Sequence, residues 1–115
     1  MALQVHLRNY RVAARKARLV ADLVRGKPVE NALAVLDLSP KRFARPLAKL
    51  VRSAVANATE SNHRSKAGID VDNLVVREIR VDEGPTMWRI KARAQGRATW
   101  IQRRSSHVVV VLEER

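Results

Sequence analysis

Apolar residues recur at helical spacing in three stretches of the first half of the chain. In the stretch 12–25, the residues Ala17, Val20, Ala21 and Val24 follow one another at i, i+3, i+4 and i+7, which places them on one face of a helix. The same spacing predicts a second helix over about 28–37 and a third over about 45–62. Their apolar stripes are Val29, Ala32, Leu33 and Leu36 in the second helix, and Leu47, Leu50, Val51, Ala54, Val55 and Ala58 in the third.

Glycine and proline mark the ends of these helices. Gly26 can adopt the positive φ that often ends a helix, and Pro28 suits the first position of the next one. Ser39 is placed to cap the region that follows the second helix. Because Pro46 has no N–H to donate, we predict a turn over 40–44 and place Pro46 in the first turn of the third helix.

The pattern changes to β-type beyond a polar loop predicted over 61–70. Residues 71–81 are rich in Val, Ile and Leu, and the run 107–112, HVVVVL, is the strongest strand signal in the chain. A β-branched run this continuous favours a strand buried on both faces, between a helix layer and neighbouring strands. We pair the two strands with each other and assign no helix or strand to residues 1–11.

The segment 82–104 then forms an excursion between the two strands. Its simplest shape is a long hairpin, whose arms would each reach roughly 30–40 Å at about 3.3 Å per residue. The tip falls near KARAQG, where Gly96 supplies a position of positive φ. The expected fold class is α+β: three helices packed on a small antiparallel sheet with a long protruding β-hairpin. We expect residues 1–115 to form one domain, with a globular part of about 8–81 and 105–115.

Composition adds a strong positive charge to this picture. The chain has 23 Lys and Arg against 11 Asp and Glu, which gives a net charge of +12. A compact domain with this charge repels itself unless a polyanion neutralises it, and nucleic acid is the commonest such partner. Arg outnumbers Lys by 17 to 6, which favours bidentate recognition of phosphate.

The charge is also unevenly distributed along the chain. Residues 1–27 and 38–66 each carry seven basic residues and one acid, whereas residues 84–112 carry six basic residues and no acid. This predicts a molecule with a basic side, a basic arm and a more acidic pole. A hairpin arm buries little apolar area of its own, so we expect it to order against a negatively charged partner.

The two tryptophans of the chain, Trp88 and Trp100, both lie in this arm. We expect them to stack on unpaired bases, as aromatic side chains do in RNA-binding modules. The alternative is mutual packing across the hairpin. They face each other if the loop is centred on Ala94, and they do not if the chain turns at Gln95 and Gly96.

Several classes of function are disfavoured by what the sequence lacks. The absence of cysteine removes disulfide scaffolds, cysteine zinc sites and thiol catalysis. His6, His63 and His107 are not at metal-ligand spacing, and no phosphate loop or nucleophile elbow occurs. We therefore expect no enzyme, no catalytic residue, no metal, no cofactor and no small-molecule substrate. No apolar run reaches the roughly 18 residues that span a bilayer, and MALQVHLRNYR is unlike a secretory signal, so we expect a cytoplasmic protein without a membrane partner.

Five stretches resemble the family of bacterial large-subunit ribosomal protein twenty-two, whose hairpin lines the peptide exit tunnel. They are RKARLVADLVRGKPVENAL (15–33), AKLVRSAVANA (48–58), VDEGPTM (81–87), ARAQGRA (92–98) and RRSSHVVVV (103–111), in that order. The resemblance covers residues from about 8 to 115. It implies a location in the ribosome, with large-subunit ribosomal RNA, neighbouring large-subunit ribosomal proteins and the nascent peptide as partners. The implied role is subunit assembly and tunnel architecture.

The candidate site follows from the charge pattern together with this resemblance. The residues expected to bind ribosomal RNA are Arg11, Arg15, Lys16, Arg18, Arg25, Lys27, Lys41, Arg42, Arg89, Lys91, Arg93, Arg97, Arg103 and Arg104. The hairpin tip expected to line the tunnel comprises Trp88, Arg89, Ile90, Lys91, Ala92, Arg93, Ala94, Gln95, Gly96 and Arg97.

The arm departs from the family pattern at several positions. Trp88 stands where the family usually has Lys or Arg, and Gln95 also replaces a frequent Lys or Arg. Ala92 replaces a frequent Pro, and Trp100 falls at a position that is not usually aromatic. These changes remove charge and add stacking surface. The alternative function is a free-standing RNA- or DNA-binding protein outside the ribosome. A membrane-active protein is disfavoured because the apolar faces of the basic helices are narrow.

Overall fold

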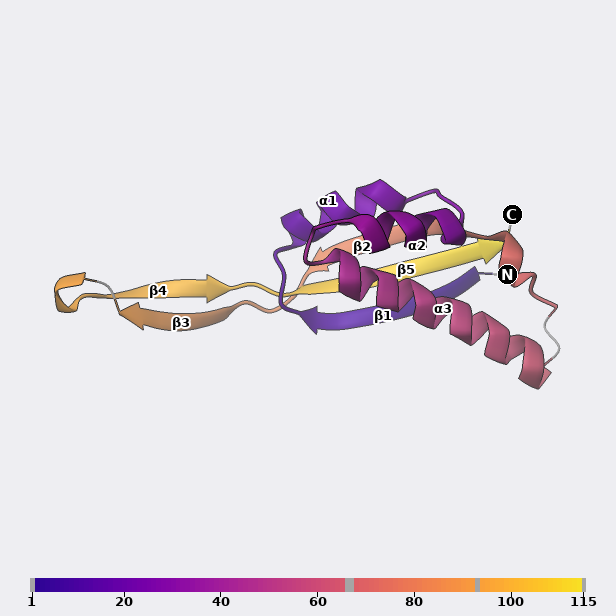
Figure 1. Ribbon diagram of the computed structural model, residues 1–115. Coiled ribbons are helices and arrows are strands. Elements are labelled where there is room, and N and C mark those ends of the chain that lie inside the picture. Colours follow the sequence, from indigo (N-terminus) through magenta and orange to yellow (C-terminus); the bar gives the residue numbers. More distant parts are fainter. Residues whose placement is uncertain (1, 66–67, 93, 115) are drawn as a thin grey trace.

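The computed structural model describes residues 2–65, 68–92 and 94–114 (Figure 1). Its helices are α1 (Ala14–Val24), α2 (Val29–Leu38) and α3 (Ala44–Ser65), with two 3₁₀ turns, η1 (Val71–Asn73) and η2 (Ala94–Gly96). Its strands are β1 (Ala2–Tyr10), β2 (Leu74–Glu83), β3 (Met87–Ala92), β4 (Ala98–Arg103) and β5 (Ser106–Glu114).

A three-stranded antiparallel sheet carries the globular part. Its order is β1-β5-β2, so β5 lies in the middle and both other strands pair with it. The three helices lie on one face of this sheet (Figure 1). α1 packs against β2, α3 packs against β1 and β5, and α2 packs against both helices. The predicted α+β class, with three helices on an antiparallel sheet and a hairpin, is confirmed.

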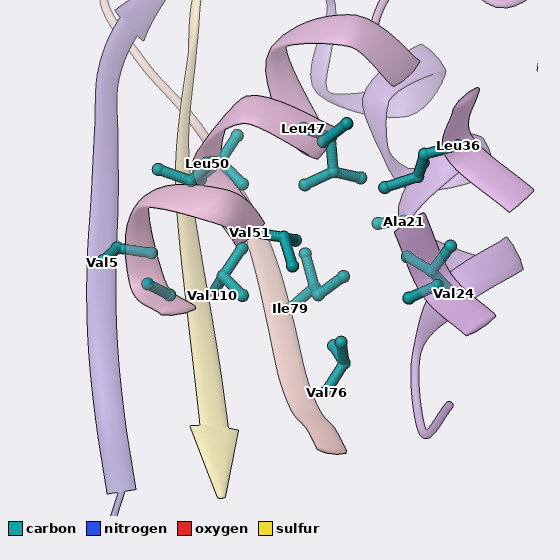
Figure 2. Packing of buried hydrophobic residues seen from close by; sticks show 14 of the residues in the cluster. Val5, Ala21, Val24, Leu36, Leu47, Leu50, Val51, Val76, Ile79 and Val110 are labelled. Atoms are coloured by element: carbon teal, nitrogen blue, oxygen red, sulfur yellow. The ribbon is translucent and has the colours of Figure 1, made fainter. Parts of the chain in front are cut away.

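The core between helices and sheet is built almost entirely from aliphatic side chains. Val5, Val110 and Ile79, one from each strand of the sheet, point toward α3 (Figure 2). On that helix, Leu47 and Val51 have no exposed surface. The helix stripes predicted from spacing therefore face the core, which places the basic faces of α1 and α3 in solvent.

A bulge in β2 keeps its apolar residues on the helix side. Leu74 and Val76 are buried in the core, and so are Ile79 and Val81, which means that the period of two breaks between 76 and 79. The pairing with β5 skips Arg77 at this point. The extra residue returns Ile79 and Val81 to the core face, because each single-residue shift in a strand reverses the side that a side chain faces.

β1 is absent from the sequence prediction, which assigns no element to residues 1–11. The strand pairs antiparallel with β5 along most of its length. Its pattern does contain a strand signal, since Leu3, Val5 and Leu7 alternate with polar residues. Val5 is buried in the core, and Leu3 and Leu7 pack against its edge.

The prediction that the strand containing 107–112 is buried on both faces, between a helix layer and neighbouring strands, is confirmed. Val109 and Val111 are 8% and 5% exposed, on the side of the sheet away from the helices. No helix of the described chain covers that side (Figure 1). These two valines are flanked instead by the longer side chains of the adjacent strand positions, Gln4, His6, Glu78 and Arg80.

α3 continues to Ser65, so the first half of the polar loop predicted over 61–70 is helical. The side chain of Asn62 holds the returning chain, because its amide donates to the carbonyl of Ile69 at 2.7 Å and accepts from the Ile69 N–H at 2.8 Å. The other helix ends lie within two residues of the predicted ones.

β3 and β4 pair with each other and project from one end of the sheet as an arm (Figure 1). The molecule therefore measures 64 × 27 × 17 Å along its principal axes. The neck of the arm is tight: the N–H of Gly84 donates to the Ser105 carbonyl at 2.9 Å, and Ser105 Oγ donates to the Pro85 carbonyl at 2.6 Å. A Cβ at Gly84 would lie 2.7 Å from Ser105 Oγ, which explains a glycine at this close approach.

Candidate nucleic-acid interface

The basic residues expected to bind RNA are exposed wherever the structure describes them. They are Arg11 after β1, Arg15, Lys16 and Arg18 on α1, Arg25 and Lys27 at the first helix corner, Lys41 and Arg42 at the second, and Arg89, Lys91, Arg97, Arg103 and Arg104 on the arm. The remaining predicted residue, Arg93, lies outside the described residues. Exposure leaves these side chains accessible to a partner, and their contact with RNA stays a prediction.

Two arginines at α1 donate hydrogen bonds from their guanidinium groups to the backbone of the protein itself. Arg18 donates from Nε and Nη2 to the carbonyl of Val81, at 3.1 and 2.9 Å. Arg25 donates from Nη2 to the carbonyl of Ile79 at 2.8 Å and also pairs with Asp22. β2 is an edge strand, so its outer carbonyls would otherwise be open to another chain. Arg18 and Arg25 close this edge, a role that the sequence pattern does not reveal.

The other basic residues of this region have different surroundings. Arg15 and Lys16 on α1, and Arg11 just before the helix, are exposed, and their side chains make no hydrogen bond or ion pair with the described part of the chain. Their charges are therefore uncompensated within the protein. Of the three positions that resemble RNA contacts of the family's first helix, Arg15 and Lys16 have free side chains and Arg18 does not.

A hollow at the α2–α3 corner is lined by four cations, and the sequence analysis predicted two of them, Lys41 and Arg42, as RNA-binding residues. It has a volume of about 610 Å³ and is lined by Leu36, Asp37, Ser39, Pro40, Lys41, Arg42, Arg45, Ala48 and Arg52. Arg52 is held in place by Asp37, since its Nη2 lies 2.9 Å from both carboxylate oxygens. Arg45 and Arg52 are seven residues apart and therefore lie on the same side of α3. That side borders the turn that carries Lys41 and Arg42. That spacing is the sequence signal that could have found them.

The register of the arm sorts its side chains into two unlike faces. Paired residues share a face of a sheet, and the pairs Trp88 with Gln102, Ile90 with Trp100 and Ala92 with Ala98 place six side chains together. None of these six carries a charge, and we call this side the uncharged face. The opposite side, the cationic face, consists of Met87, Arg89, Lys91, Thr99, Ile101 and Arg103.

The pairing also decides between the two arrangements expected for the tryptophans. The loop is centred on Gln95, so Trp88 and Trp100 are diagonal neighbours on the uncharged face and do not lie directly opposite each other. Trp88, Ile90 and Trp100 are 58%, 61% and 63% exposed. Within the described part of the chain, the ring pair found is that of Tyr10 and Phe43, so the two indoles do not pack on each other.

The tip of the arm turns through two residues in the left-handed region. Gly96 has a φ of 72°, as predicted, and Gln95 has a φ of 63° although it is not glycine. All described residues between Trp88 and Arg97 are exposed. At the base of β4, Arg104 donates from Nη2 to Oε1 of Gln102 at 2.9 Å, which holds its guanidinium beside the uncharged face.

Negative charge collects at the end of the molecule away from the arm. Asp70 and Asp72 lie at η1, which leads into the start of β2, and Glu113 and Glu114 end β5 next to that start. β5 begins at the neck of the arm and runs away from it (Figure 1). Four of the eleven acidic residues therefore lie opposite the arm, whereas Asp82 and Glu83 end β2 at its neck.

The described residues include no group of three His, Asp or Glu side chains that could hold a metal ion. They also include no helix that is both long and apolar enough to cross a membrane.

Comparison with known proteins gives one consistent result. The family model described as Ribosomal protein L22p/L17e matches residues 5–113. The chain is 50% identical over 114 residues to the large ribosomal subunit protein uL22 of Myxococcus xanthus (strain DK1622), which covers 99% of this chain and 97% of that one. It is 51% identical over 108 residues to the protein of the same name from Desulfitobacterium hafniense (strain Y51), with coverages of 94% and 90%. Identity to the uL22 protein of Desulfatibacillum aliphaticivorans is 46% over 114 residues, with coverages of 99% and 100%.

Proposed function

Because the chain belongs to the family Ribosomal protein L22p/L17e, we propose that it is a large-subunit ribosomal protein that binds the RNA of that subunit, aids subunit assembly and lines the peptide exit tunnel with its arm. Membership confirms the family identified from the sequence motifs. It also makes the protein a structural, non-enzymatic constituent of the ribosome, as the sequence predicts. RNA binding, assembly and the position in the tunnel are the proposal.

The arm is the observation that carries this proposal. Every described side chain of β3 and β4 is exposed, apart from the half-buried Ile101. Residues 84–112, which include the arm, contain six basic residues and no acid, so nothing within this stretch neutralises its charge. A two-stranded hairpin with so little buried area gains its order from a partner. A polyanion that surrounds both faces of the arm supplies what the chain itself lacks.

Basic side chains of the globular part are a second observation in favour of RNA as the partner. Arg11, Arg15 and Lys16 near the start of α1 have free side chains, and the hollow at the α2–α3 corner holds four cations against one carboxylate. Such groups bind phosphate oxygens without reading sequence. In this arrangement the globular part anchors on folded RNA while the arm extends inward, beside neighbouring large-subunit proteins and, at its tip, the nascent peptide.

Co-sedimentation tests the ribosomal location. The tagged protein is expressed in its bacterial host, and ribosomal subunits are separated on sucrose gradients after a wash at high salt. We expect the protein to remain with the large subunit and to be depleted from the small-subunit fraction. Recovery of nearly all the protein in the ribosome-free fraction would support the alternative of a free-standing RNA- or DNA-binding protein.

Crosslinking from the tip tests the tunnel position. The chain has no cysteine, so Gln95→Cys introduces a single attachment site for a photoreactive label at the centre of the loop. Glu30→Cys, on the exposed surface of α2, is the matched control. In translating ribosomes, the label at position 95 should crosslink to the nascent peptide and the label at position 30 should not. Equal nascent-peptide crosslinking from both positions would argue against a tunnel-lining arm.

A further inference from the structure

We propose that Trp88 and Trp100 form a clamp that holds one unpaired RNA base between their rings, on the uncharged face of the arm. This inference rests on the RNA-binding function proposed above and specifies what the arm recognises. The two indoles lie diagonally across β3 and β4, with Ile90 adjacent to both: it is two residues from Trp88 on the same strand and directly opposite Trp100. Ile90 thus supplies an apolar floor to the clamp.

The spacing of the two tryptophans suits one base. Diagonal neighbours of an antiparallel pair are about 7–8 Å apart. A base between two rings needs about 7 Å, which is twice the stacking distance of about 3.4 Å found between neighbouring bases. The indoles are not packed on each other and are both more than half exposed, so neither ring is covered by the other.

The chemistry of the two faces indicates which part of RNA each one meets. None of the six residues of the uncharged face is a cation, although Gln102 holds Arg104 beside it, and the aromatic rings of this face can stack on any base. The cationic face behind it offers Arg89, Lys91 and Arg103 to the backbone. A base inside a duplex is already stacked on its neighbours, so the clamp selects unpaired nucleotides of a loop or bulge.

Intrinsic fluorescence is a direct probe of this clamp, because the chain contains no tryptophan outside it. The full-length protein is titrated with a labelled single-stranded oligoadenylate or a blunt RNA duplex of equal length. The anisotropy of the label reports binding, and indole emission reports stacking in the same sample. We expect the oligoadenylate to quench most of the emission, whereas the duplex binds with little quenching.

Substitutions distinguish a clamp from two independent contacts. Trp88→Ala and Trp100→Ala should each weaken oligoadenylate binding about tenfold, in line with the loss of one stacking contact, and the double variant should be no weaker than either single one. Ile101→Ala, on the opposite face of the arm, is the control for the indoles and should leave the quenching by oligoadenylate unchanged. Losses that multiply in the double variant would overturn the clamp.

The same titration separates failure of the clamp from failure of the function. A rise in label anisotropy without quenching of the indoles means that RNA binds and that the clamp is wrong. A shift of the emission to shorter wavelength without quenching also rejects the clamp, because it reports an apolar contact and not a stacked base. An unchanged anisotropy with both RNAs contradicts the proposed function itself.

Discussion

Arg15 and Arg18 lie three residues apart on α1 and meet different surroundings. The Arg15 side chain makes no hydrogen bond or ion pair with the described chain, whereas Arg18 donates two hydrogen bonds to the Val81 carbonyl on the outer edge of β2. Both carry the same charge and both are counted as exposed. The difference arises from helix rotation, which directs Arg18 toward the sheet and Arg15 toward solvent.

This difference predicts opposite effects of the same substitution. Arg18→Ala should lower the free energy of unfolding by about 1–2 kcal/mol, because a carbonyl at the sheet edge loses charged donors. Arg15→Ala should change it by less than about 0.5 kcal/mol and weaken RNA binding instead. Urea denaturation measures the first quantity and RNA titration the second. Equal stabilities of the two variants would contradict the edge-closing role of Arg18.

Residue roles of this kind could not be predicted from the sequence. The pattern places Arg18 correctly on the polar side of α1, but it does not indicate that the side chain reaches the edge of β2. The bulge at Arg77 is likewise visible only as a broken alternation, and the positive φ of Gln95 has no compositional signal. By contrast, the positive φ of Gly26 and Gly96 was predictable, because glycine adopts it without steric cost.

At the scale of elements, the helices were predictable because each presents a complete apolar stripe to one sheet. Alanine fills five of the fourteen positions of these stripes, and Ala17, Ala21, Ala54 and Ala58 have no exposed surface. β1 could have been predicted from its alternation. The two-faced character of the arm could not, because it depends on a register that changes with a one-residue shift of the loop.

Buried alanines predict a steric limit on helix packing. Ala21→Leu should destabilise the protein by about 1–3 kcal/mol, because the larger side chain cannot be placed between α1 and the sheet without displacing neighbours. Ala56→Leu makes the same chemical change at an exposed position of α3 and should have an effect within about 0.5 kcal/mol. Thermal or urea unfolding followed by circular dichroism measures both. A tolerated leucine at position 21 would mean that α1 packs less closely than described.

The arm and the globular part should be separable. Replacement of residues 86–103 by Asn-Gly leaves the neck pair of Gly84 and Ser105 in place and removes no residue of the buried core. We expect unfolding of this variant to stay cooperative, with a midpoint within a few degrees of the full chain. Loss of a single cooperative transition would show that the division into globular part and arm is wrong.

At the scale of the whole molecule, shape is as diagnostic as charge. The Cα radius of gyration is 17.5 Å, whereas a compact domain of this length has a value of about 13 Å. The excess is due to the arm, which makes the longest dimension 64 Å. The arm carries basic residues and no acid, whereas Asp70, Asp72, Glu113 and Glu114 lie at the opposite end of the long axis.

Small-angle X-ray scattering of the free protein checks this shape. The full chain should give a radius of gyration close to that of the extended structure, and the variant that lacks residues 86–103 should approach the compact value of about 13 Å. Measurement in moderate salt limits repulsion between molecules of net charge +12. A compact value for the full chain would mean that the arm folds back on the globular part.

Because β5 is the central strand of the sheet, the sheet can form only after the C-terminal end of the chain has been synthesised. β1 and β2 both pair with β5, and the pair Val5–Val110 joins residues 105 positions apart (110 − 5). Pairing over such distances gives a high contact order and slow folding. During synthesis the arm precedes β5, so its cations emerge while β1 and β2 still lack their partner. Each new copy therefore presents its basic arm to polyanions before the sheet that supports that arm can close.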